Sequence, residues 1–283
     1  MTETLDAVLR GLIYLAATFV IFYVGKRGYD LRYPGVRLRD ALFQDDNVAL
    51  GVAVVGYYAG LVLALGGILQ GASVGLLYDL IDIGIYGLLA VVLVLISAWI
   101  NDRVILRHFR NRKEIFDDRN VGTGAVEAGN HIANGLLIAG AISGEGGGIG
   151  TALAFWGLGQ IGLVVAGLLY TRMLGYDLHG EIERDNVAAG VAFAGVLIAI
   201  GNVVRLGTVG DFISWADNLT VYGLYLVAGL VLLPVTRFVT DLVLVPGAKL
   251  TEELAHQEHP NLGAGFLEAF SYIAASMLIG WTI

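Results

Sequence analysis

The sequence predicts an all-α polytopic membrane protein with eight transmembrane helices, arranged as two parallel four-helix repeats. Three observations predict this fold class: an apolar composition, eight long apolar segments, and a duplicated order of motifs. Of the 283 residues, 57% are hydrophobic and 15% are charged, and the mean hydropathy is +0.73. Soluble domains average about 45–50% apolar and about 25% charged residues, so the composition excludes an ordinary soluble enzyme.

Eight segments are long and apolar enough to span a bilayer, which needs about 20 such residues. In chain order they are 5–24, 48–70, 76–100, 121–142, 151–174, 187–206, 216–240 and 262–282. Glu3 and Asp6 stand where a signal peptide would carry basic residues, so we interpret the first segment as a retained helix.

Three motifs recur in the same order in the two halves of the chain. Gly-Tyr-Asp-Leu at 28–31 returns at 175–178, and Asp-Asn-Val-Ala at 46–49 returns at 185–188. Asn120, with Gly124 and Glu127, returns as Asn261 with Gly265 and Glu268. The chain therefore divides into residues 1–145 and 146–283. Because each half holds an even number of spans, the two repeats have the same orientation.

A shorter repeat lies within each half, because an asparagine precedes every even-numbered span and a glycine follows four residues later. The asparagines are Asn47, Asn120, Asn186 and Asn261. We interpret them as helix N-caps, and the glycines as points of close helix approach. An alternative is that the four helix N-termini converge on an anion. The shorter repeat divides the chain into four two-helix hairpins. A ring with a pseudo-fourfold axis is one way to pack them.

The basic residues predict the orientation. Fifteen of the 17 lysine and arginine residues lie in the connections that follow odd-numbered spans or in the last residues of the spans before them. The positive-inside rule puts these connections in the cytoplasm and both chain termini outside it. The exceptions, Arg10 and Arg205, lie near the opposite ends of their helices, where a long side chain reaches water.

Polar side chains on the fourth and eighth spans are the candidate functional residues. Glu127, Asn130, His131 and Asn134 share one helix face, and Glu268 with Tyr272 repeats part of it. In a ring the two carboxyl groups would approach each other across the axis and bind a proton or cation, with His131 as a relay. The alternative is that both glutamates are hydrogen-bonded packing residues. Ionisable groups at membrane depth are costly, which makes them functional candidates.

The motifs at 28–31, 46–53 and 120–124 resemble the YjfL-like family of bacterial inner-membrane proteins, also called domain of unknown function 350. The resemblance covers nearly the whole chain, as two tandem four-helix units. It implies location in the bacterial inner membrane, and it brings no reaction or catalytic residue with it.

Two function classes remain. The first is a channel or transporter for protons, monovalent cations or a small cationic solute, with Glu127 and Glu268 in its path. The second is a membrane scaffold that docks a cytoplasmic protein on the basic 101–120 loop. A homodimer through small-residue faces is compatible with either class. An enzyme is least favoured, since no nucleophile–base pair, metal-ligand set or cofactor motif is present. The chain has no cysteine, and its net charge of −8 disfavours nucleic acid.

Overall fold

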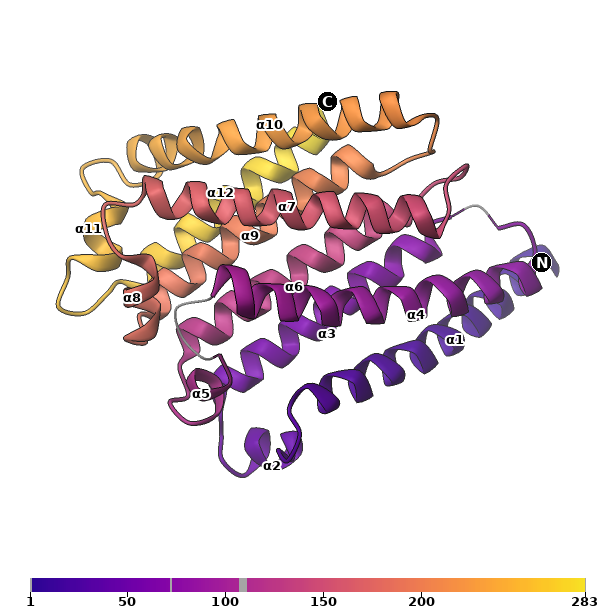
Figure 1. The fold of residues 1–283 in the computed structure, drawn as a ribbon, viewed down its shortest axis with the longest axis horizontal. Coiled ribbons are helices and arrows are strands. Elements are labelled where there is room, and N and C mark those ends of the chain that lie inside the picture. The colour runs from indigo at the N-terminus through magenta and orange to yellow at the C-terminus, as the bar shows by residue number, and fades with distance from the viewer. Residues whose placement is uncertain (1, 72, 107–110, 283) are drawn as a thin grey trace.

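The computed structural model describes residues 2–71, 73–106 and 111–282, and these residues form helices and no strand. Eight helices are long. Their bounds are α1 Thr2–Arg32, α3 Val48–Leu69, α4 Leu76–Ile100, α6 Val121–Ala141, α7 Ile149–Met173, α9 Val187–Thr208, α10 Trp215–Val239 and α12 Leu262–Thr282. Figure 1 shows them side by side with similar axes. The predicted all-α fold class is confirmed.

Four short helices lie toward one end of the bundle, which we call the short-helix end (Figure 1). They are α2 Leu38–Phe43, α5 Asn111–Phe116, α8 Leu178–Glu183 and α11 Leu250–Ala255. The opposite end, the turn end, holds the connections near residues 70–75, 142–148 and 209–214. Two π-helical turns, η1 Asn101–Ile105 and η2 Thr240–Leu244, extend α4 and α10 at equivalent places in the two repeats.

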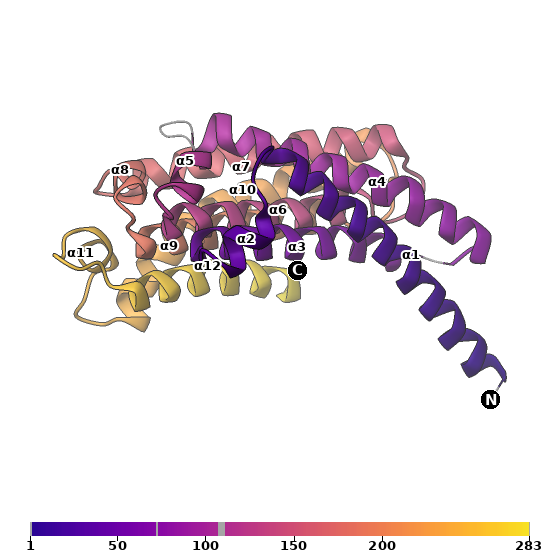
Figure 2. The same cartoon turned by 90° about the horizontal axis from the view of Figure 1, so that it is seen from below.

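Seven long helices are apolar enough to span a membrane by length and composition. The eighth, α6, carries the polar face with Glu127 and His131 and lies in the middle of the bundle, packed between α3 and α9. Helix α1 is the opposite case, because its side chains are largely exposed and its N-terminal part runs away from the other helices (Figure 2). An exposed apolar helix of this kind is suited to contact with lipid.

The even-numbered spans pack in a row, in the order α3, α6, α9, α12. The ring considered from the sequence is therefore wrong. The other long helices flank the row: α4 packs on α3 and α6, α7 on α6 and α9, and α10 on α9 and α12. Two grooves are lined by the row helices and the residues just after them, so one side of the row is left uncovered.

Glycine brings the row helices together. A Cβ atom at Gly60 would lie 2.1 Å from the backbone oxygen of His131, and one at Gly135 would lie 2.1 Å from the backbone oxygen of Gly60. Such contact between backbones needs residues without side chains. The small residue nine positions after the N-cap asparagine recurs in α3, α6 and α9, but α12 has the exposed Phe270 there. The row ends at this helix.

The asparagines that precede the row helices also connect neighbouring units. The Nδ2 groups of Asn47, Asn120 and Asn186 donate to the carbonyl oxygens of Ile115, Ile182 and Leu254, at 2.8, 2.6 and 2.7 Å. Each acceptor lies in the short helix ahead of the next row helix. One hydrogen bond of the same kind therefore joins each successive pair of units along the row.

Candidate functional site

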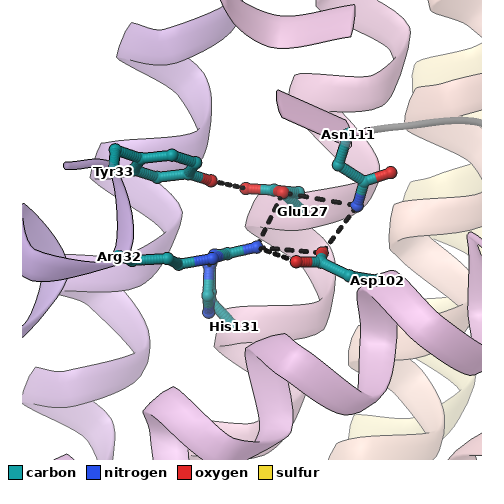
Figure 3. Close-up of polar contacts among 6 residues, drawn as sticks. All are labelled: Arg32, Tyr33, Asp102, Asn111, Glu127 and His131. Carbon is teal, nitrogen blue, oxygen red and sulfur yellow. Dashed lines mark hydrogen bonds and ion pairs between the residues drawn. The ribbon is translucent and has the colours of Figure 1, made fainter. Parts of the chain in front are cut away.

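The candidate site is a buried cluster of polar side chains in the first repeat, beside α6 near the short-helix end (Figure 3). Its centre is Glu127, whose side chain is 1% exposed. Glu127 lies two turns inside α6, which begins after the N-cap Asn120. At 1.5 Å per residue this is roughly 10 Å along the helix.

Arg32, the last residue of α1, joins two carboxylates in this cluster. Its Nη2 lies 3.0 Å from Oε1 of Glu127 and 2.8 Å from Oδ2 of Asp102, which stands in η1. Asn111 of α5 donates to Oδ1 of Asp102 at 2.7 Å and to Oε1 of Glu127 at 3.4 Å. Three elements distant in sequence thus converge on Glu127 (Figure 3).

Tyr33 approaches the other carboxylate oxygen, with its hydroxyl 3.5 Å from Oε2 of Glu127. Burial, followed by the charge of Glu127, raises the pKa of Tyr33 well above its usual value. The phenol therefore stays neutral and serves as a hydrogen-bond donor.

The described part of the cluster holds more carboxyl groups than guanidinium groups. Among the described residues, which leave out 107–110, the Arg32 guanidinium contacts both Asp102 and Glu127, and full ionisation of these three groups would give them a net charge of −1. The Asp102 side chain is 30% exposed, whereas that of Glu127 is 1% exposed. An uncompensated buried charge is strongly unfavourable, and Glu127 is the more deeply buried of the two carboxyl groups.

His131 lies one turn further along α6 than Glu127. Its Nε2 is 3.5 Å from Nη1 of Arg32, and its ring packs edge-on to Tyr57. Arg32 can only donate, so Nε2 acts as the acceptor and the proton sits on Nδ1. Nδ1 is buried and has no hydrogen-bond partner among the described residues.

A second polar group continues from His131 toward the middle of α6. Nδ2 of Asn134 donates to the backbone oxygen of Asn130 at 2.9 Å and to its Oδ1 at 3.1 Å. Gln160 of α7 donates a short hydrogen bond to Oδ1 of Asn134. Polar side chains therefore extend from Asp102 at the short-helix end to Gln160 inside the bundle.

The second repeat contains a related cluster, in which the arginine pairs with one carboxyl group among the described residues. Glu268, 1% exposed, forms an ion pair with Arg237 and accepts from the hydroxyl of Tyr170 at 2.8 Å. Arg237 also donates to Oγ1 of Thr251 at 2.7 Å. Tyr272 takes the place of His131, and its buried hydroxyl has no partner among the described residues.

The two glutamates do not face each other, which corrects the expectation drawn from a ring. Each is paired with an arginine of its own repeat, and α9 lies between α6 and α12. The row arrangement is the reason, because it separates the second and fourth helices that a ring would place across an axis.

The predicted N-cap asparagines have their side chains at the starts of the row helices. Oδ1 of Asn47, Asn120, Asn186 and Asn261 accepts from the backbone N–H three residues later, at 2.8–3.2 Å. The first three are buried and Asn261 is exposed. The side-chain amides of these asparagines therefore bind backbone groups. The N-termini of the four helices follow one another along the row and do not converge on one point.

Sequence reasoning did not identify the charged partners Arg32, Asp102 and Arg237, nor the hydrogen-bonding residues Tyr33, Asn111, Tyr170 and Thr251. Arg32 and Arg237 entered the sequence analysis only among the basic residues that predict the orientation. Asp102 has an equivalent in Asp241, each the second residue of its π-helical turn, and this repetition is a signal present in the sequence. The predicted first span ends before Arg32, because charged residues begin at Lys26. In the structure α1 continues to Arg32, and an ion pair of 2.6 Å between Lys26 and Asp30 lies on this last part of the helix. Among the described residues, no group of three histidine or carboxylate side chains has a metal-ligating arrangement.

The chain is similar to a known protein family and to a curated transmembrane protein. The model of the family described as Domain of Unknown Function (DUF350) matches twice, over residues 3–142 and 146–283. A UPF0719 transmembrane protein of Aquifex aeolicus (strain VF5) is 23% identical over 270 residues, which cover 94% of this chain and 97% of that protein. No solved structure matches the chain.

Proposed function

The chain belongs to the DUF350 family, with two tandem copies of the family's domain, and we propose that this integral membrane protein moves protons or monovalent cations across the bacterial inner membrane. Glu127 is the group that binds the transported ion. The short-helix end faces the cytoplasm, because most basic residues lie there.

The observation that carries this proposal is the charge imbalance around Glu127. Among the described residues Arg32 compensates one carboxylate, and the cluster holds two, Glu127 buried and Asp102 partly exposed. Polar and ionisable side chains at membrane depth are costly and commonly belong to ion or proton pathways. A bound proton or monovalent cation removes the excess charge, and its exchange is the elementary step of transport.

The order of polar groups supports a direction of entry. Asp102 is partly exposed at the short-helix end and shares Arg32 with Glu127. His131 follows one turn deeper with its Nδ1 unpartnered, and the Asn134–Gln160 pair lies beyond it. A histidine beside a carboxyl group is suited to relay a proton. An ion that enters past Asp102 therefore meets Glu127 first and His131 second.

The second repeat takes a different part in the proposal. Arg237 balances Glu268, and Tyr170 satisfies the same carboxylate oxygen. Among the described residues Arg237 pairs with no second carboxyl group, so we assign Glu268 to stabilising the bundle and the ion to the first repeat. The two carboxyl groups act separately, and not as a shared pair.

Ion flux in proteoliposomes tests the proposal. The full chain is reconstituted, a pH or monovalent-cation gradient is imposed, and flux is compared between the wild type and Glu127→Gln. We expect Glu127→Gln to abolish flux, since the amide keeps the shape of the side chain and cannot exchange a proton.

The matched control is Glu114→Gln. Glu114 is also buried, in α5, and burial raises its pKa, but its carboxylate accepts from Asn120 and lies outside the path. Glu114→Gln should retain flux. Equal flux in the wild type and Glu127→Gln would refute the proposal. No flux in either would favour docking of a cytoplasmic protein on the 101–120 segment, of which residues 107–110 lie outside the described structure.

A further inference from the structure

A groove of about 330 Å³ lies on the uncovered side of the row, near the turn end. All four row helices contribute to it. Its apolar walls include Leu63, Leu136, Ile273 and Met277, and its polar side chains include Gln70, Asn202, Arg205 and Ser276. The groove is therefore amphipathic, in contrast to the second groove, between α3 and α6, which is lined by apolar residues and glycine.

Arg205 is held in place on the wall of this groove. Its Nε donates to Oδ1 of Asn202 at 3.1 Å, and Nδ2 of Asn202 donates to Oγ of Ser276 at 3.2 Å. Among the described residues, no carboxylate lies within ion-pair distance of the Arg205 guanidinium. The contact with Asn202 is the one hydrogen bond that this side chain makes to them. The half-buried guanidinium thus keeps uncompensated charge and free donors.

Asn202 and Arg205 both differ in type from the residues at the equivalent positions of the other row helices. Sixteen residues after the N-cap asparagine, the row helices carry Leu63, Leu136, Asn202 and Met277. Nineteen residues after it they carry Gly66, Ala139, Arg205 and Gly280. The same helix packing is thus made elsewhere with apolar or small residues at these positions. Packing alone does not account for an Asn–Arg pair on α9.

We propose that this groove binds the phosphate headgroup of an anionic phospholipid, with Arg205 as the phosphate-binding residue. A guanidinium presents paired donors that match phosphate oxygens, and it is less strongly hydrated than an ammonium group. The groove lies beside the lipid-facing surface of the row, so the walls around Leu63 and Met277 accommodate the first part of the acyl chains. Its location differs from that of Glu127, and it does not depend on ion transport.

Lipid retention by the purified full chain tests the site. The protein is exchanged into nanodiscs that contain phosphatidylglycerol and phosphatidylcholine in equal amounts, extracted into mild detergent, and analysed by native mass spectrometry for bound lipid. One surface cation attracts anionic lipid by about 1 kcal/mol, so we expect a preference for phosphatidylglycerol of about five-fold. Arg205→Gln should lower this preference to near unity.

Three further measurements make the result specific. Arg10→Gln removes the other arginine in the turn-end half of the bundle, which is exposed and paired with Asp6 at 2.8 Å, and it should leave the preference unchanged. Arg205→Lys keeps the charge and should retain part of the preference, which tests the site if Arg205→Gln does not fold. Inorganic phosphate should not displace the lipid, because it lacks acyl chains.

Two results would overturn the proposal. An unchanged preference in folded Arg205→Gln would mean that Arg205 only extends to interfacial water. Displacement of the bound lipid by inorganic phosphate would assign the groove to a free anion.

Discussion

At the scale of single residues, the two repeats use the same glutamate in different charge environments. Glu127 shares Arg32 with Asp102, whereas Glu268 has Arg237 as its ion-pair partner. The arginines also come from different helices of their repeats, the first from α1 and the second from α10. Duplication therefore preserved the carboxyl group and not the partner that neutralises it.

This difference predicts unequal effects on stability. Glu268→Gln leaves Arg237 buried without a carboxylate and should destabilise the protein by about 3–5 kcal/mol. Glu127→Gln leaves Arg32 paired with Asp102, so no buried arginine loses its last carboxylate, and it should cost less than Glu268→Gln. Unfolding in mixed micelles measures both, and the reverse order would show that charge balance does not govern these sites.

At the scale of elements, one hydrogen-bonding unit is repeated along the row. The residue before the N-cap is left-handed in three units, with φ of 49° at Asp46, 53° at Arg119 and 60° at Asp185. The fourth unit has Pro260 there, and proline fixes φ near −65°. Asn261 is also exposed, and its side-chain amide donates to Glu253. The end of the row is thus encoded in local sequence.

The asparagines should differ in importance according to their place in the row. Asn120→Ala removes a helix cap and the hydrogen bond to Ile182, so we expect a loss of about 2–3 kcal/mol. Asn261→Ala lacks the connection to a next unit and should cost about 1 kcal/mol. Thermal unfolding of the two variants makes the comparison, and equal losses would mean that the connecting hydrogen bonds add nothing.

Two glycines on α3 give a similar test of helix packing. Gly60→Ala would place a Cβ 2.1 Å from a backbone oxygen of α6, and forcing these helices apart should cost about 1–3 kcal/mol. Gly66→Ala meets no atom within 4 Å and should be neutral or stabilising by up to about 1 kcal/mol. Unfolding in mixed micelles distinguishes them. Equal tolerance would contradict close backbone packing in the row.

At the scale of the whole molecule, a central polar helix is surrounded by apolar ones. Helix α6 has two row neighbours and further contact with α4 and α7, so its polar face is shielded from the surroundings. The exposed apolar side chains lie on the outer helices, α1 and α10 among them. This distribution places the hydrophobic surface toward lipid and the ionisable residues inside the protein.

The orientation of the whole molecule is open to a direct test, because the chain has no native cysteine. Ile213→Cys introduces a thiol at the turn end and Glu258→Cys one at the short-helix end, both at exposed positions. With the basic short-helix end in the cytoplasm, a membrane-impermeant thiol reagent should label Ile213→Cys in intact cells, and Glu258→Cys only after permeabilisation. The opposite pattern would reverse the predicted topology.

The long helices could be predicted from the sequence, because apolar length and N-cap asparagines are local properties. Glu127, His131 and Glu268 could be identified as candidates for the same reason, because an ionisable residue within an apolar segment is recognised from the sequence alone. Three features became known only from the tertiary structure. The row helices form a row and not a ring, the two glutamates lie apart, and the ion pairs are those that Arg32 makes with Asp102 and Glu127 and that Arg237 makes with Glu268. These depend on contacts between residues about 30 to 100 positions apart, and such contacts follow from helix packing that no single segment encodes.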